Sequence, residues 1–145
     1  MDTFVKALSW VNLRYLLEGF GITIEVSIWA IIISFLAGSL LGVARYINVK
    51  YFSAIVGFVI DIIRNLPLLL ILFFVYFGLP GIGIRVAVVP AAIIALSIFE
   101  SAMLAEIIRS GISAVPKGQM EAARSNGLTY VQAWCKSLCP KRFVR

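Results

Sequence analysis

Four ionisable residues lie inside long apolar stretches of the sequence. Asp61 and Arg64 are three residues apart, and Glu100 and Glu106 share a later stretch. A charged side chain in a bilayer costs about 2.5–3.5 kcal/mol on insertion scales, so it usually faces a cavity or a partner. Two roles stay open for Asp61, Arg64 and Glu100: a path for a solute that carries both charges, or structural pairing such as Asp61 with Arg64 across one helical turn. For Glu106 and Arg109, towards the inner surface, the structural role is favoured.

Other chemistry has few candidate residues. The sequence contains no histidine, and its two cysteines, Cys135 and Cys139, form a Cys-x3-Cys pair that makes a poor zinc site without further ligands. No G-x-x-x-x-G-K-[ST] phosphate-binding loop is present. We therefore expect no catalytic residues, no metal, no cofactor and no ATP hydrolysis by the chain itself.

The composition indicates a membrane protein. Of the 145 residues, 61% are hydrophobic and 14% are charged, and the mean hydropathy is +1.00. A soluble domain has about 25% charged residues, which keep its surface hydrated. The net charge of +6 then reflects topology and anionic lipid headgroups rather than nucleic acid.

Three apolar segments, about 21–44, 51–77 and 86–108, are long enough to cross a hydrocarbon core of about 30 Å. The first contains Gly38 and Gly42, a G-x-x-x-G pair that either allows close helix contact or reflects the abundance of glycine in membrane helices. The second is longer than a perpendicular crossing requires, which suits a tilted span or an entry along the interface.

The basic residues predict the orientation. Nine are expected on one side of the membrane and three on the other, with residues 1–20 forming an extracytoplasmic segment. The larger group consists of Arg45, Lys50, Arg109, Lys117, Arg124, Lys136, Lys141, Arg142 and Arg145, and the smaller of Lys6, Arg14 and Arg85. Because positive loops stay cytoplasmic, the N-terminus is predicted outside and the C-terminus in the cytoplasm of a multi-pass cell-membrane protein.

A short polar helix is predicted at about 116–127, on the cytoplasmic side. Gly127 fits the left-handed position just beyond a helix C-terminus. Thr129 and Gln132 have the T-x-x-Q spacing of a capping box that begins the next helix. The polar helix is therefore expected to be sharply bounded.

The same helix has a composition suited to contact with a partner. Ala122 and Ala123 keep one patch flat, Met120 adds an adaptable apolar side chain, and Glu121 can pair with Arg124. The alternative is a helix that lies on the membrane surface, but a solvated face would not need two adjacent alanines.

The run Glu121-Ala122-Ala123, followed after three residues by Gly127, resembles the EAA motif of the membrane subunits of bacterial ATP-binding-cassette importers. Further motifs resemble the polar amino-acid branch of that family in the same order, over about residues 16–133: 19–23, 64–69, 73–80, 105–112 and 116–119. Any one of these motifs would be weak evidence for the family, but five of them in the same order on the same segments are specific.

The resemblance implies an all-α membrane fold and an importer permease for polar amino acids such as glutamine or glutamate. It implies that Met120, Glu121, Ala122, Ala123 and Gly127 belong to a coupling helix that docks on a cytoplasmic ATP-binding subunit. The other implied partners are a second permease subunit, identical or homologous, and an extracytoplasmic amino-acid-binding protein.

The sequence departs from this family after the coupling helix. From the resemblance we expect the family's last two spans to be missing, with an importer transmembrane domain at 21–133 and an atypical tail at 134–145. Ser137 and Cys139 stand where the family has Ile and Leu, although Pro140 keeps its place, so we hypothesise that a frameshift produced the tail. A non-functional truncated remnant, or an ATP-independent small carrier or channel, is the alternative to an active permease subunit.

Overall fold

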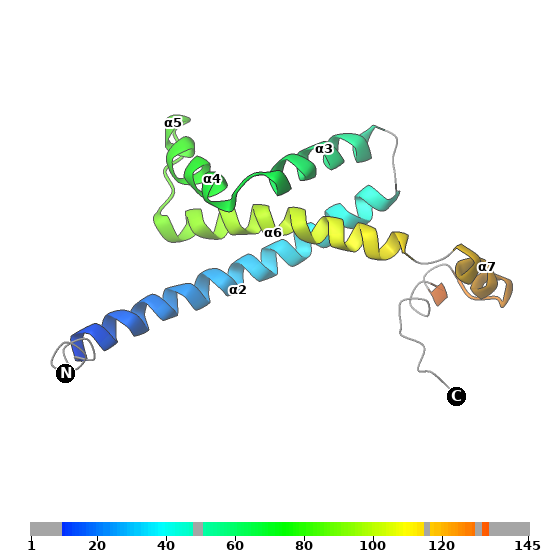
Figure 1. The fold of residues 1–145 in the computed structure, drawn as a ribbon, viewed down its shortest axis with the longest axis horizontal. Helices are drawn as coiled ribbons and strands as arrows, with labels where there is room; N and C mark the ends of the chain where they lie inside the picture. The colour runs from blue at the N-terminus through cyan, green and yellow to red at the C-terminus, as the bar shows by residue number, and fades with distance from the viewer. Residues whose placement is uncertain (1–9, 48–50, 115–116, 130–131, 134–145) are drawn as a thin grey trace.

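The computed structural model describes residues 10–47, 51–114, 117–129 and 132–133, and all regular elements in these ranges are helical (Figure 1). The predicted all-α membrane fold is therefore confirmed. In chain order the elements are α2 (Trp10–Ile47), α3 (Phe52–Asn65), α4 (Leu68–Phe73), the π-helical turn η1 (Phe74–Gly78), α5 (Leu79–Gly81), α6 (Val88–Ser113) and α7 (Lys117–Ser125).

Two described helices, α2 and α6, are each long and apolar enough to cross a membrane. A third crossing requires α3 and the segment Leu68–Gly81 to act together as one broken span. The predicted segment 51–77 is thus two helices bent by 104° rather than one continuous helix. Pro67 explains the break, because it favours an extended residue before it, and Leu66 has ψ 141°.

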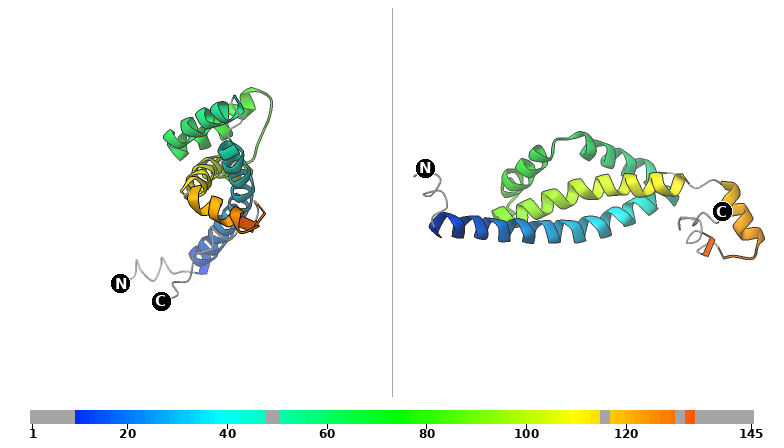
Figure 2. Two further views of the ribbon diagram at one scale, coloured as in Figure 1. Left: turned by 90° about the vertical axis from the view of Figure 1, so that its right-hand side faces the viewer. Right: turned by 60° about the horizontal axis from the view of Figure 1, so that its bottom comes forward.

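Helix α2 is longer than the predicted span at 21–44, and α6 continues past residue 108 to Ser113. The 38 residues of α2 extend about 57 Å at 1.5 Å per residue, whereas the hydrocarbon core is about 30 Å thick. The first part of α2, up to Trp29, is almost entirely exposed and projects beyond α6 (Figures 1 and 2). Residues 10–20 of the predicted extracytoplasmic segment are therefore a helical continuation of the span.

The close approach of α2 to α6 determines the packing of the whole bundle. A Cβ atom on Gly38 would lie 2.9 Å from the backbone oxygen of Ser101, and one on Gly42 would lie 2.7 Å from that of Ala105. No side chain fits at such distances, so the two backbones touch through glycine. Of the two interpretations of the G-x-x-x-G pair, close helix contact is the one that the structure bears out.

Helix α3 covers the other side of this pair. Ile60 is 2% exposed and packs with Ala102 and Ala105 of α6, both of which are also buried. After the bend, Ile71 and Val75 pack on Ala91 and Ala95 nearer the start of α6. Small residues along α6 thus admit neighbours on both sides, as is usual where membrane helices associate.

Adding a methyl group at the glycine contact should loosen the bundle. We expect Gly42→Ala to destabilise the chain by about 1–3 kcal/mol, the usual range for an overpacked core. The matched control is Gly19→Ala on the same helix, where a Cβ meets nothing within 4 Å. Unfolding by sodium dodecyl sulfate in mixed micelles measures both, and equal stability of the two variants would contradict the close contact.

Candidate functional site

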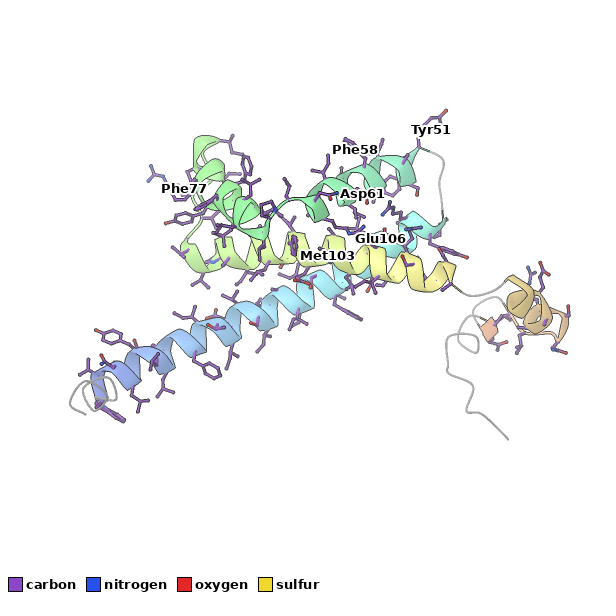
Figure 3. The ribbon with its side chains drawn as sticks, in the orientation of Figure 1. Tyr51, Phe58, Asp61, Phe77, Met103 and Glu106 are labelled. Carbon is purple, nitrogen blue, oxygen red and sulfur yellow. The ribbon has the colours of Figure 1, made fainter. Side chains whose placement is uncertain are left out.

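A cluster of five charged side chains joins three helices near the C-terminal ends of α2 and α6. Arg45 comes from α2, Asp61 and Arg64 from α3, and Glu106 and Arg109 from α6. Figure 3 shows Asp61 and Glu106 in the space between α3 and α6. Apart from an exposed i,i+4 pair near the start of α2, every ion pair in the described part of the chain belongs to this cluster.

Glu106 is the centre of the cluster. Its carboxylate accepts a hydrogen bond from Arg45 Nη1 and another, 3.1 Å long, from Arg109 Nε. Ser110 Oγ donates a further bond of 3.4 Å. The side chains of Glu106 and Arg45 are only 17% and 16% exposed, so water screens their attraction weakly. The structural role predicted for Glu106 and Arg109 agrees with this geometry.

Arg45 also holds α3 in place. Its Nη2 atom lies 3.4 Å from Asp61 Oδ2, and its backbone oxygen accepts a 3.0 Å hydrogen bond from Ser53 Oγ. A Cβ atom on Gly57 would lie 3.0 Å from Arg45 Nε, so the glycine leaves room for the guanidinium. The sequence predicts for Arg45 only a cytoplasmic position, because its partner lies 61 residues away.

Asp61 and Arg64 form an ion pair, one of the two roles left open for them, with Arg64 Nη1 3.6 Å from Asp61 Oδ1. Glu100 is elsewhere: it lies on the exposed side of α6 and makes no ion pair or hydrogen bond with the described residues. The structure therefore brings Asp61 and Arg64 together and leaves Glu100 outside their cluster.

An apolar groove of about 420 Å³ lies between α2, α3 and α6. Its lining is aliphatic except for Ser97 and Ser101: Ile33, Ala37, Leu41, Ile55, Val56, Val59, Ile60, Ile63, Ile98 and Ala102. A zwitterion would lose its hydration there without gaining ionic partners, so the groove suits hydrocarbon rather than a polar solute.

The polar helix predicted at 116–127 is α7, which is Lys117–Ser125 followed by a tight turn. Gly127 has φ +77°, and its N–H donates to the oxygen of Arg124 at 3.0 Å. The N–H of Leu128 donates to the oxygen of Ala123 at 3.3 Å. These two bonds form a Schellman motif, so the left-handed glycine predicted at this position is confirmed.

The capping box that follows is also confirmed. The N–H of Thr129 donates to Gln132 Oε1 at 3.1 Å, and the N–H of Gln132 donates to Thr129 Oγ1 at 3.4 Å. The two bonds satisfy donors that a helix start would otherwise leave unpaired. The turn after α7 is thus stabilised from both sides.

Helix α7 presents polar and small side chains to its surroundings. Glu121 and Ala122 are exposed and Ala123 is half-buried. No ion pair between Glu121 and Arg124 occurs among the described contacts, so the Glu121 carboxylate has no side-chain partner within the described ranges. The side chain of Met120 and the tail at 134–145 lie outside the described residues. In Figure 1, α7 stands beyond the end of α6, away from the bundle.

Comparison with known proteins adds a family match. Residues 30–141 match the family model described as "Binding-protein-dependent transport system inner membrane component". The chain is 51% identical over 142 residues to the probable glutamine ABC transporter permease protein GlnP of Bacillus subtilis (strain 168), covering 98% of the chain and 65% of that relative. It is 31% identical to the glutamate/aspartate import permease protein GltK of Escherichia coli O157:H7, covering 91% of the chain and 62% of the relative.

A solved structure is similar as well. The chain matches the crystal structure of an amino acid ABC transporter with histidines at a TM-score of 0.79 and 36% identity, covering 92% of the chain and 63% of that chain. The chain therefore spans a little under two thirds of the length of the relatives and of the solved chain that it matches.

Removing the charge at the centre of the cluster should be costly. We expect Glu106→Gln to destabilise the chain by about 3 kcal/mol, because it leaves Arg45 and Arg109 without their shared carboxylate in a weakly hydrated site. Glu18→Gln is the control, since its pair with Arg14 has side chains 54% and 74% exposed, and exposed pairs contribute about 0–1 kcal/mol. Unfolding by sodium dodecyl sulfate in mixed micelles measures the stability of both variants. If Glu106→Gln lost no more stability than Glu18→Gln, a stabilising role for Glu106 would be refuted.

Proposed function

The chain belongs to the family of binding-protein-dependent transport system inner membrane components, and from this premise we propose that it forms the membrane-spanning permease part of an ATP-driven amino-acid importer. The similarity to permeases named for glutamine and for glutamate/aspartate supports a polar amino acid as the transported solute. The chain's own part is to provide the membrane path and to receive the ATP-driven movement, while a partner hydrolyses ATP.

The observation that carries this proposal is the construction of α7. A short helix outside the bundle would fray unless an end were fixed. Here a left-handed glycine and two backbone hydrogen bonds fix the C-terminal end of α7, a capping box begins the next helix, and Glu121 and Ala122 remain exposed. A rigid helix with a flat, partly acidic face suits docking in a groove of another protein.

In the proposed complex α7 docks on a cytoplasmic ATP-binding subunit. Ala122 and Ala123 allow a close approach, Glu121 offers its carboxylate to a basic group, and Met120 adds an apolar contact. Gly127 keeps the turn that sets the direction of the chain after α7. The arrangement requires α7 and the C-terminus in the cytoplasm and the N-terminus outside.

The charge cluster supports a route by which a movement of α7 would reach the membrane helices. Only residues 114–116 separate α6 from α7, and the last turns of α6 carry Glu106 and Arg109. Because Glu106 is bound to Arg45 of α2 and Arg45 to Asp61 of α3, a displacement of α6 acts on all three helices. In this proposal ATP binding draws the coupling helices together, and the bundle changes its access from one side to the other.

The remaining proposed partners follow from the same assignment. A second permease subunit, identical or homologous, completes the path, and an extracytoplasmic binding protein delivers the amino acid. Asp61, Arg64 and Glu100 are proposed to line the path, since charges of both signs suit a zwitterion. Glu100 is exposed on α6 and makes no ion pair or hydrogen bond within the described ranges, and this supports the proposal because a bare carboxylate against lipid would be costly.

Co-purification with the ATP-binding subunit tests the docking of α7. We expect Glu121→Lys to reverse the charge on the docking face and Gly127→Pro to destroy the turn, since proline cannot adopt φ +77° or donate the bond to Arg124. Each should reduce retained ATP-binding subunit at least about tenfold, which corresponds to about 1.4 kcal/mol.

The matched control for both variants is Gly118→Ala. Gly118 lies on the same helix, and a Cβ atom there meets nothing within 4 Å. This variant should retain the ATP-binding subunit as the unmodified chain does. Undiminished binding by both Glu121→Lys and Gly127→Pro would rule out α7 as the docking helix.

A further inference from the structure

The charge cluster is not electrically balanced. Three guanidinium groups, those of Arg45, Arg64 and Arg109, face the two carboxylates of Asp61 and Glu106, which leaves one positive charge without a counter-charge among the described residues. In water, a single uncompensated positive charge would be fully hydrated. Here it lies beside Arg45 and Glu106, whose side chains are only 16% and 17% exposed, so hydration is incomplete and a bound anion would be favourable.

The hydrogen bonds show which arginine holds the surplus. Arg45 donates to both Glu106 and Asp61, and Arg109 donates to Glu106 through Nε and Nη2. Arg64 makes no hydrogen bond within the described part of the chain. Its two ion pairs are long, 3.6 Å to Asp61 and 3.9 Å to Glu106.

The Nε atom of Arg64 is the clearest sign of a missing partner. It is buried and has no acceptor among the residues that the structure describes, although the side chain as a whole is 35% exposed. A buried donor without an acceptor costs about 1–3 kcal/mol, and more when the group is charged. The exposed part of the guanidinium gives an incoming group a route to the side chain.

We propose that Arg64 is the anchor of an anion-binding site that takes one carboxylate or phosphate group. Guanidinium binds such planar or tetrahedral oxyanions through paired N–H donors, and the added negative charge would neutralise the cluster. Two sources offer this chemistry inside a membrane: the α-carboxylate of an amino acid and the phosphate of an anionic lipid. Assignment to the amino acid rests on the proposed function, whereas the site itself does not.

Nuclear magnetic resonance of the arginine Nε–H groups tests the site directly. The full chain, labelled with 15N-arginine, is placed in nanodiscs of phosphatidylcholine and titrated with L-glutamine, with L-glutamine amide, which lacks the carboxylate, and with inorganic phosphate. A second preparation replaces part of the lipid with phosphatidylglycerol. The variant Arg64→Lys identifies the Arg64 signal by removing it and keeps the positive charge. The matched control is Arg85→Lys, at an exposed position outside the cluster.

The expected result is a saturable shift of the signal assigned to Arg64, which Arg85→Lys leaves unchanged. A response to L-glutamine but not to its amide supports the site with the substrate carboxylate as the source. A response to phosphatidylglycerol or phosphate supports it with a phosphate as the source. In Arg64→Lys the affinity for the responding probe, followed on the Arg45 and Arg109 signals, should fall at least about tenfold.

The proposal is overturned if the Arg64 signal responds to none of these probes, or if only Arg45 and Arg109 respond in the unmodified chain. The experiment requires neither the ATP-binding subunit nor uptake. An anion-dependent Arg64 signal in a chain that supports no transport would therefore keep the site and count against the proposed function alone.

Discussion

The contact on which this structure depends is the backbone approach of α2 to α6 at Gly38 and Gly42. In a bilayer, lipid tails are as apolar as leucine, so helices associate through close packing and polar contacts rather than through the hydrophobic effect. The two glycines provide the close packing. They also position the polar contacts, because Arg45 follows Gly42 by one helical turn and Glu106 is adjacent to Ala105, against which Gly42 packs.

The ion cluster is therefore a consequence of the glycine contact and adds what packing alone cannot supply. Small residues allow helices to touch but do not select one rotation or depth. The bonds from Arg45 to Glu106 and Asp61, and from Ser53 to the backbone of Arg45, set the register of three helices at one end of the bundle. That end is also the one from which α7 extends (Figures 1 and 2). In the proposed function, these few side chains would connect the docking helix α7 to the membrane path.

Local features of the structure were predictable from the sequence. Gly127, the capping box at Thr129 and the pair of Asp61 with Arg64 each depend on residues within four positions of one another, where helix geometry fixes the distance. The apolar segments were predictable because their length must match the bilayer.

Non-local features were not predictable in the same way. The partner of Arg45 is 61 residues distant, so no spacing rule could identify it. Pro67 was visible, yet the 104° bend depends on how α3 and α4 pack on different parts of α6. The sequence did not predict the start of α2 at Trp10, because the span was recognised by the length of its apolar run, and Arg14 and Glu18, which pair along the helix, lie before that run. A helix can continue past the membrane where an apolar pattern stops.

The most direct test of the proposed coupling is site-specific photo-crosslinking in intact membranes that contain the ATP-binding subunit. A photoreactive residue at Ala122 of α7 is compared with one at Tyr15, an exposed position on the projecting part of α2. We expect a crosslink from position 122 to the ATP-binding subunit and none from position 15. Crosslinks from position 122 to lipid alone, with the subunit present and bound elsewhere on the chain, would contradict it.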